Sequence, residues 1–375
     1  MKKIKVVHYI GDMDNGGAQA LIRDYACLID KDKFEVGILT LYPVLDTANV
    51  KILKESGVNF FSVYKSRSIL ERMKHRVYKK FWIKRGIKRF IEQQGPDIIH
   101  CHLLVLLTIY WISNSLKDIK LFYTCHTLPE RLFAGTHKAE YKAADYLIKN
   151  NGLQIIALHE KMKNELNKMF SIDSTIVLKN GVDFNRFKSL KLTKEEIRKQ
   201  FAIAETDFVI GHIGRFAYMK NHSFLIDVFR RIVMMRPDSK LILVGDGPLY
   251  EEVKRKVVKL DLENRTIFLK DRMDIPEILK MMDVFVFPSI FEGLPVSVVE
   301  AQVSGLKTVV SDSLTNECFL TSTLIPASLN RDASEWAEVI LDDSKQGPYN
   351  KDISAFDMNV VIRKLENYYM NKIII

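Results

Sequence analysis

The feature that most constrains the fold is an alternation of short apolar runs with helix-like segments, which occurs in two successive series. Short β-branched runs separated by longer segments of helical periodicity are typical of parallel sheets with crossover helices. The first series of strand-like runs comprises residues 5–10, 36–41, 59–63, 98–100, 121–124, 154–158 and 175–178. The second comprises residues 208–213, 240–244, 266–269, 284–287, 308–310 and 324–325. The sequence therefore predicts an α/β protein with two doubly wound, Rossmann-like sheets.

The length of the chain agrees with two domains. Its 375 residues exceed one ordinary hydrophobic core, and a polar stretch at 188–196 separates the two series. We predict an N-terminal domain over residues 1–187 and a C-terminal domain over residues 188–355. A last helix is expected from residue 356, within 356–375.

Composition is that of a soluble globular protein, with 47% hydrophobic and 27% charged residues. The longest apolar run, 103–112, is far too short to span a bilayer. The first residues lead directly into a strand, so we expect no signal peptide. The four cysteines lack metal or C-x-x-C spacing and are predicted to be reduced thiols of a cytoplasmic protein: Cys27, Cys101, Cys125 and Cys318.

The net charge of +10 is concentrated in one segment. Residues 64–90 hold eleven Lys or Arg and one acid, so this segment alone accounts for the whole net charge. An apolar face interrupted near Trp82 predicts a basic amphipathic helix that docks on an anionic membrane surface. A purely structural helix with solvated charges is the alternative, and no nucleic-acid-binding fold accompanies the segment. The predicted membrane contacts are Arg72, Arg76, Lys79, Lys80, Lys84 and Arg85.

A candidate ligand site lies in residues 288–305. The buried strand 284–287 is followed by the turn Glu292-Gly293-Leu294-Pro295 and then by a helix that carries Glu300. A glycine-bearing turn between a parallel strand and a helix is where open α/β sheets bind anionic ligands. The two carboxylates could reach different hydroxyls of one ligand.

Five motifs in the C-terminal half occur in the order of one known family. They are Gly214-Arg215-Phe216, Lys220-Asn221, Val244-Gly245-Asp246-Gly247-Pro248, Glu292-Gly293-Leu294-Pro295 and Glu300-Ala301. With the turn Gly16-Gly17-Ala18-Gln19, they make the chain resemble retaining GT-B glycosyltransferases of family four, also called glycosyl transferases group 1. This resemblance implies two Rossmann-like domains facing across a cleft. It also implies that the last helix returns to the N-terminal, acceptor-side domain.

The resemblance assigns a nucleotide-sugar donor to the C-terminal domain. Arg215 and Lys220 would stabilise the negative charge that grows on the leaving diphosphate. Glu292 would face the transferred sugar, and Glu300 would accept hydrogen bonds from the ribose. The backbone N–H groups of the turn and helix start would surround sugar and phosphate oxygens. This stretch comprises Gly293, Leu294, Pro295, which itself has no N–H, and Val296. Arg272 and Met273 belong to the predicted base-recognition loop, whose side chains do not distinguish uracil from guanine.

The N-terminal domain contributes fewer predicted site residues. Gly16 and Gly17 would let the backbone approach the diphosphate, although the full dinucleotide fingerprint is missing. His126 matches the family histidine near the reacting face of the sugar. Asp12-Met13-Asp14 resembles a D-x-D metal motif but is expected to serve a turn or a helix cap. His100-Cys101-His102 has zinc-like spacing without a nearby third ligand, so we expect no metal.

The sequence thus predicts a metal-independent retaining glycosyltransferase without a cofactor. We expect a nucleoside diphosphate sugar, in the first place a UDP-sugar, and a lipid-linked glycan acceptor in capsule, exopolysaccharide or lipopolysaccharide assembly. The expected location is cytoplasmic, peripheral at the inner face of the plasma membrane, with no nucleic-acid partner. A UDP-sugar epimerase of the same fold and a non-catalytic membrane-bound subunit of a glycan assembly complex are the alternatives, while an oxidoreductase would need a better dinucleotide fingerprint.

Overall fold

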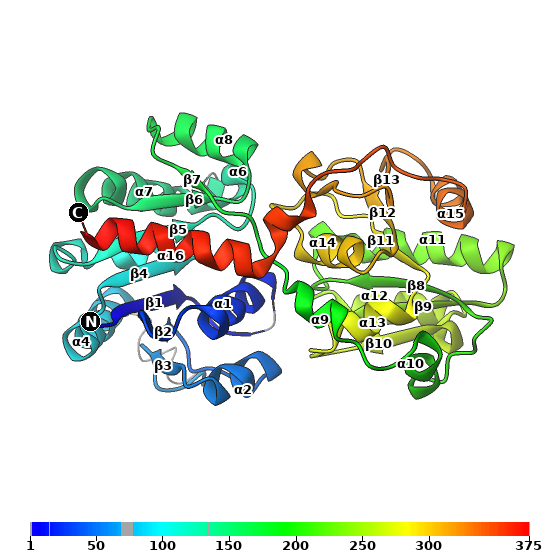
Figure 1. Cartoon of the computed structure of the whole chain (residues 1–375), viewed down its shortest axis with the longest axis horizontal. Helices are drawn as coiled ribbons and strands as arrows, with labels where there is room; N and C mark the ends of the chain where they lie inside the picture. Colours follow the sequence, from blue (N-terminus) through cyan, green and yellow to red (C-terminus); the bar gives the residue numbers. More distant parts are fainter. Residues whose placement is uncertain (1, 15, 69–77, 134, 375) are drawn as a thin grey trace. The chain divides into compact units, whose positions relative to one another are not determined.

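The computed structural model describes residues 2–14, 16–68, 78–133 and 135–374. The chain forms two compact units (Figure 1). The first unit is Met1–Asn180 together with Asn359–Ile375, and the second is Gly181–Met358. Both are built on parallel sheets, which confirms the predicted α/β class.

The first unit contains a seven-stranded parallel sheet in the order β3-β2-β1-β4-β5-β6-β7. Every predicted strand of the first series is present. The strands are β1 (Ile4–Ile10), β2 (Phe34–Thr40), β3 (Asn59–Ser62), β4 (Ile98–His102), β5 (Lys120–Thr124), β6 (Gln154–Ala157) and β7 (Ile176–Val177). Their near-continuous apolar character follows from burial of both faces of a parallel sheet.

Helices connect these strands and cover the first sheet. They are α1 (Gly17–Leu28), α2 (Ala48–Glu55), α4 (Lys79–Gln94), α5 (Leu106–Tyr110), α6 (Pro129–Phe133), α7 (Lys138–Asn151) and α8 (Glu160–Phe170). The last helix, α16 (Met358–Ile374), lies along this sheet and is drawn in red in Figure 1. Tyr369 packs edge-on against Phe122 of β5, with ring centroids 5.1 Å apart, and Glu366 accepts from the backbone N–H of Asp30 at 2.8 Å.

The second unit contains a six-stranded parallel sheet in the order β10-β9-β8-β11-β12-β13. Its strands are β8 (Phe208–Ile213), β9 (Ser239–Val244), β10 (Thr266–Leu269), β11 (Val284–Phe287), β12 (Lys307–Ser311) and β13 (Leu324–Ala327). Its helices are α9 (Phe184–Lys188), α10 (Lys194–Gln200), α11 (His222–Met235), α12 (Tyr250–Lys259), α13 (Ile275–Met281), α14 (Val296–Val303) and α15 (Ala333–Leu341). Trp336 of α15 is fully buried in the core beside α11.

The chain passes between the units at residues 180–181 and again at 358–359. The first crossing precedes the polar stretch at 188–196, because the segment after Asn180 is already paired within the second unit. Val182 donates to the carbonyl of Phe356 at 2.8 Å and forms a parallel bridge with Asp357. A Cβ on Gly181 would lie 2.8 Å from Sδ and 3.0 Å from Cα of Met358, so a larger residue would require Met358 to shift.

Candidate functional site

The order of strands places most of the predicted residues at the reversal point of each sheet. In the first sheet, β1 lies beside β4, and in the second, β8 lies beside β11, so neighbouring strands lead their connections to opposite faces. Ligands of open α/β sheets bind outside the carboxyl ends of strands at such points. In the second unit, Arg215 and Lys220 follow β8, and Glu292 follows β11.

The turn after β8 packs closely against the loop after β9, which contains Gly245 and Gly247. The N–H of Gly214 donates to the carbonyl of Val244 at 2.9 Å, and that of Phe216 to the carbonyl of Asp246 at 3.0 Å. A Cβ on Gly245 would lie 2.2 Å from the Gly214 carbonyl oxygen, and one on Gly247 would lie 2.5 Å from that of Phe216. Both glycines also have positive φ angles, 139° and 156°, which residues with a Cβ rarely adopt. The Gly-Asp-Gly motif is therefore explained by close packing behind Arg215.

Lys220 and Glu292 meet across the reversal point. Lys220 Nζ lies 2.7 Å from Oε1 of Glu292, and the two side chains are only 14% and 15% exposed. The contact joins opposite charges without the angle of a good hydrogen bond. The same ammonium lies 4.4 Å from the ring centroid of Phe287 at the end of β11. A second tie between the two loops is the 2.8 Å hydrogen bond from the N–H of Ile290 to the carbonyl of Met219.

Arg215 and Glu300 flank this pair in the sequence but differ in environment. Arg215 is exposed, and no ion pair of its guanidinium occurs within the described part of the chain. Glu300 is half-buried within α14, whose first residue, Val296, follows Pro295 directly. The residues 293–295 before the helix are buried, which holds the turn against the sheet.

The predicted base-recognition loop follows the edge strand β10. The guanidinium of Arg272 is paired with Asp274, with Nε 2.8 Å from Oδ1, and this pairing raises the pKa of Arg272. The carbonyl of Met273 accepts from Arg186. Both residues thus have partners inside the second unit, and any contact of this loop with a base stays a prediction.

In the first unit, the turn after β1 is held by its acidic residues. Oδ1 of Asp12 accepts from the backbone N–H of Asp14 at 3.2 Å, as expected of a turn residue, and Asp14 is paired with Arg67 at 2.7 Å. Helix capping, the other predicted role, does not occur, because the N-cap of α1 is Gly16. A Cβ on Gly17 would have no heavy atom within 4 Å, so the fold itself does not require glycine there.

His126 lies at the end of a row of three histidines. Its Nε2 is 2.8 Å from Nδ1 of His102, and Nε2 of His102 is 3.0 Å from Nδ1 of His8. The rings come from β1, β4 and the loop after β5, which are neighbours in the sheet. Burial lowers the pKa of His126 to about 4 and that of His8 to about 3. Burial also lowers the pKa of His102 well below its usual value, so all three rings are neutral at pH 7.

A fourth histidine, His100, completes this buried cluster. Its Nδ1 is 2.6 Å from the Tyr369 hydroxyl, and its Nε2 is 2.7 Å from the hydroxyl of Thr124. His8, His100 and His102 bring ligand atoms within 4.8 Å of one another, so the third histidine missing from the local sequence comes from another strand. A metal ion would have to displace the hydrogen bonds of His100 and His102, which engage all four of their ring nitrogens.

Sequence reasoning missed His8 and Tyr369. His8 sits in the strand next to β4, directly opposite His100 in register. The sequence contained a partial indication of His8, because a histidine near the end of the first strand of a doubly wound sheet lies close to the reversal point. Nothing in the sequence pattern indicated Tyr369, which lies 269 positions from its partner His100.

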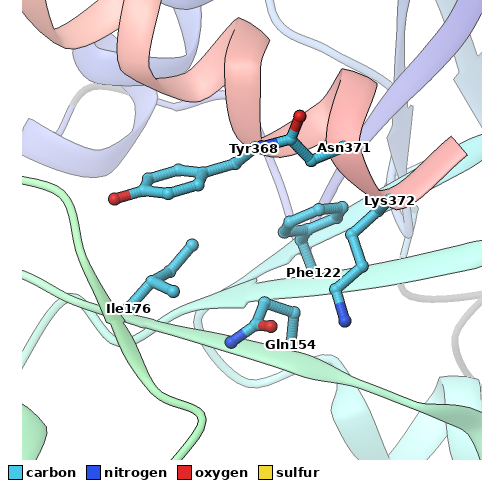
Figure 2. A pocket seen from close by; sticks show the side chains of 6 residues that line it. All are labelled: Phe122, Gln154, Ile176, Tyr368, Asn371 and Lys372. Atoms are coloured by element: carbon cyan, nitrogen blue, oxygen red, sulfur yellow. The ribbon is translucent and has the colours of Figure 1, made fainter. Parts of the chain in front are cut away.

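A small surface pocket lies elsewhere in the first unit. Figure 2 shows its lining residues, which are Phe122, Gln154, Ile176, Tyr368, Asn371 and Lys372. None of them is a predicted site residue, and the amide of Gln154 is already used on the carbonyl of Ile155 at 3.3 Å. The pocket is therefore separate from the predicted site.

Residues 79–90 of the basic segment belong to α4, whereas its described residues 64–68 lie outside any helix. Ile83, Ile87 and Phe90 are buried against the unit, whereas Phe81 and Trp82 are 55% and 40% exposed. The predicted contacts Lys79, Lys80 and Arg85 are exposed and Lys84 is half-buried; Arg72 and Arg76 lie outside the described residues. Within the described chain, no helix is both long and apolar enough to cross a membrane.

Comparisons with known proteins agree with the fold of two parallel-sheet α/β units. The family model Glycosyltransferase Family 4 matches residues 15–186, and Glycosyl transferases group 1 matches residues 193–322. The putative glycosyltransferase EpsF of Bacillus subtilis (strain 168) is 28% identical over 345 residues, covering 90% of this chain and 86% of that protein. The UDP-Gal:alpha-D-GlcNAc-diphosphoundecaprenol alpha-1,3-galactosyltransferase of Escherichia coli is 24% identical over 396 aligned positions, covering 99% and 98%.

Among solved structures, Anabaena HepE in complex with UDP-glucose matches with a TM-score of 0.77. It is 20% identical and the match covers 98% of this chain and 100% of that one, which bears on the fold alone. The two family models together span most of the chain, and the fold agrees with both. The chain therefore belongs to the GT-B glycosyltransferases of family four, the glycosyl transferases group 1.

Proposed function

We propose that the protein is a retaining, metal-independent glycosyltransferase of bacterial polysaccharide assembly. It transfers a sugar from a UDP-sugar to a hydroxyl of a lipid-linked glycan at the inner face of the membrane. The observation that carries the proposal is the meeting of Lys220 and Glu292 at the reversal point of the second sheet, with Arg215 in the same segment after β8 as Lys220.

The paired charges suit a donor that is both anionic and rich in hydroxyls. Lys220 supplies a cation for the diphosphate. Glu292, whose Oε1 lies 2.7 Å from Lys220 Nζ, supplies a hydrogen-bond acceptor for sugar hydroxyls. An exposed Arg215 adds a planar, bidentate donor for phosphate oxygens. A diphosphate gains charge as the glycosidic bond breaks, so these cations stabilise the transition state more than the ground state. Because they supply that positive charge, no divalent ion is needed in this proposal.

The retaining step proposed here keeps both events on one face of the sugar. The bond from the anomeric carbon to the diphosphate oxygen breaks, and the acceptor oxygen forms its bond on the same face. The acceptor proton passes to the leaving phosphate oxygen. Uracil as the base is supported by the UDP-glucose complex of HepE and by the UDP-galactose donor in the name of the Escherichia coli relative.

A lipid-linked acceptor and peripheral membrane binding are supported by the surface of α4. Its exposed Phe81 and Trp82 stand beside the exposed cations Lys79, Lys80 and Arg85. Aromatic rings next to basic side chains are favourable at the headgroup region of an anionic bilayer. The name of the Escherichia coli relative also specifies a diphosphoundecaprenol-linked acceptor.

The test is a donor screen followed by transfer to lipid-linked acceptors. Purified protein is incubated with UDP-, GDP- and ADP-sugars with and without EDTA, and hydrolysis and transfer are measured. We expect turnover of a UDP-sugar that EDTA does not reduce, that Lys220→Ala and Glu292→Gln abolish, and that the matched control Lys256→Ala preserves. Lys256 is also ion-paired, with Asp227 at 2.6 Å on α11, and none of the predicted site residues is its partner.

Other outcomes identify the alternatives. Conversion of the donor to its epimer without an acceptor identifies an epimerase. If wild type, Lys220→Ala and Glu292→Gln do not differ in donor hydrolysis or transfer, the enzyme proposal fails and the non-catalytic subunit remains as the alternative. Inversion at the anomeric carbon, read by NMR of the product, contradicts the retaining step. Loss of turnover with EDTA that is restored by a divalent ion contradicts metal independence.

A further inference from the structure

Three histidines form a continuous hydrogen-bonded row at the carboxyl edge of the first sheet. The row runs from His8 of β1 to His102, the last residue of β4, and then to His126, which follows β5. His8 and His102 are fully buried, whereas His126 is half-buried. The row thus connects the interior of the unit with its surface at the sheet reversal.

Neutral imidazole carries one N–H and one bare nitrogen, so each bond in the row restricts the next. If Nδ1 of His8 donates to His102, then Nδ1 of His102 must donate to Nε2 of His126. The proton of His126 is then on Nδ1, its outer nitrogen. In the opposite direction, His126 donates inward through Nε2 and presents a bare Nδ1. The row therefore has two possible directions, and they differ in what His126 offers to a ligand.

The buried end of the row decides between the two directions. Nε2 of His8 is buried without a hydrogen-bond partner among the described residues. In the first direction this atom is a bare nitrogen, and in the second it is an unpaired N–H. Buried N–H groups without partners are rarer in proteins than unpaired acceptors, which favours the first direction.

We infer that His102 is a positioning residue that holds His126 with its proton on Nδ1, so that His126 presents an N–H donor at the surface of the first unit. The role of that donor rests on the proposed function: it hydrogen-bonds an oxygen of the bound sugar. Because the outer nitrogen already carries a proton, it does not accept the proton of the attacking hydroxyl. That proton is left to the leaving phosphate.

The surroundings of His102 prevent the ring from turning. His100 stacks on it with centroids 4.3 Å apart and planes at 29°. His100 is itself fixed at both nitrogens, by Tyr369 and Thr124. Since the three rings are neutral at pH 7, their order is set by hydrogen bonding rather than by charge.

The test reads the tautomers directly, by two-bond ¹H–¹⁵N correlation of ¹⁵N-histidine-labelled full-length protein at pH 7. Protonated and bare ring nitrogens resonate far apart, and His126→Gln identifies the His126 signals among the nine histidines. We expect wild-type His126 to carry its proton on Nδ1. His102→Leu should remove that preference, whereas His102→Asn should keep it, because the Asn amide nitrogen lies near the position of Nδ1. Tyr369→Phe removes one of the two hydrogen bonds of His100, but the bond to Thr124 still holds that ring and the row stays intact; it is the matched control and should change nothing at His126.

The outcomes separate this inference from the proposed function. A wild-type His126 protonated on Nε2 overturns the inference, whatever the enzyme transfers, and so does an unchanged His126 tautomer in folded His102→Leu. Near-ultraviolet circular dichroism verifies the fold of each variant. If turnover is found, His102→Leu should lower kcat by no more than His126→Phe does, and the double variant should be no slower than His126→Phe. Absence of turnover with every donor contradicts the proposed function but leaves the tautomer result standing.

Discussion

The ion pair between Lys220 and Glu292 predicts a measurable coupling in the stability of the second unit. At 2.7 Å and an effective dielectric constant of about 20, the attraction is about 6 kcal/mol before desolvation is subtracted. Net values are about 0–1 kcal/mol for exposed pairs, while breaking a buried pair costs about 3–5 kcal/mol. With 14% and 15% exposure, this pair lies nearer the buried limit, so we expect each single neutralisation to cost about 2–3 kcal/mol.

The perturbation is the double-mutant cycle of Lys220→Met and Glu292→Gln. Each single variant leaves one charge without its partner, whereas the double variant leaves none, and the Met side chain can pack on Phe287. The double variant should therefore lose less stability than the two single variants together, with a coupling of about 2 kcal/mol. The control cycle, Lys256→Met with Asp227→Asn, breaks a pair that is 25% and 46% exposed and should show less than about 1 kcal/mol.

Urea unfolding followed by tryptophan fluorescence measures these energies. Trp336 is fully buried in the second unit, and the two other tryptophans, Trp82 and Trp111, are in the first. A Trp82→Phe, Trp111→Phe background therefore makes the signal specific to the second unit. A coupling below about 0.5 kcal/mol, no larger than ordinary deviations from additivity, would refute the view that the two side chains form a partly buried pair.

Saturating UDP extends the same experiment to the ligand. If Lys220 moves to the diphosphate, it has a new partner, so the coupling between residues 220 and 292 should shrink. Lys220→Met should lose about 1.5–3 kcal/mol of UDP affinity, the range of a hydrogen bond to a charged group, or roughly tenfold to a hundredfold. Glu292→Gln should bind UDP at least as well as wild type. Equal coupling with and without UDP contradicts the assignment of Lys220 to the diphosphate.

Three further predictions concern other parts of the chain. Burial raises the pKa of Glu140 from 4.5 to about 7, so between these pH values the folded protein holds a proton that the unfolded chain releases. The free energy of unfolding should therefore fall by up to about 3 kcal/mol as pH rises from 4.5 to 7. Glu140→Gln should have the melting temperature of wild type at pH 5 and a higher one at pH 8. Gly247→Ala should destabilise by about 2–4 kcal/mol in urea, while Gly17→Ala should leave stability unchanged or slightly higher and reduce turnover only if a ligand approaches its backbone. Phe81→Ser with Trp82→Ser should weaken co-sedimentation with anionic vesicles, and binding that is unaffected by these changes or by salt contradicts membrane docking through α4.

The strands and helices could be predicted from the sequence because each depends mainly on the pattern of apolar, polar and glycine residues within a short stretch. Strand β11 is an unbroken apolar run, and the strand β8 has the predicted bounds, Phe208–Ile213. Burial on both faces requires such runs, and the turns between them need glycine or polar residues nearby. The basic helix was also predictable, and Ile83, Ile87 and Phe90 form its buried face.

What the sequence did not determine is which turns become neighbours. Lys220 and Glu292 lie 72 positions apart and meet because β8 pairs with β11, which is not the next strand along the chain. His8 reaches His102 for the same reason, since β1 pairs with β4. Hydrophobic periodicity depends only on which face of an element is buried, so it specifies strands and helices but not their order in a sheet. The sequence alone thus determined the elements, the motifs and the family resemblance; the tertiary structure decided the ion pair, the histidine row and the partners of α16.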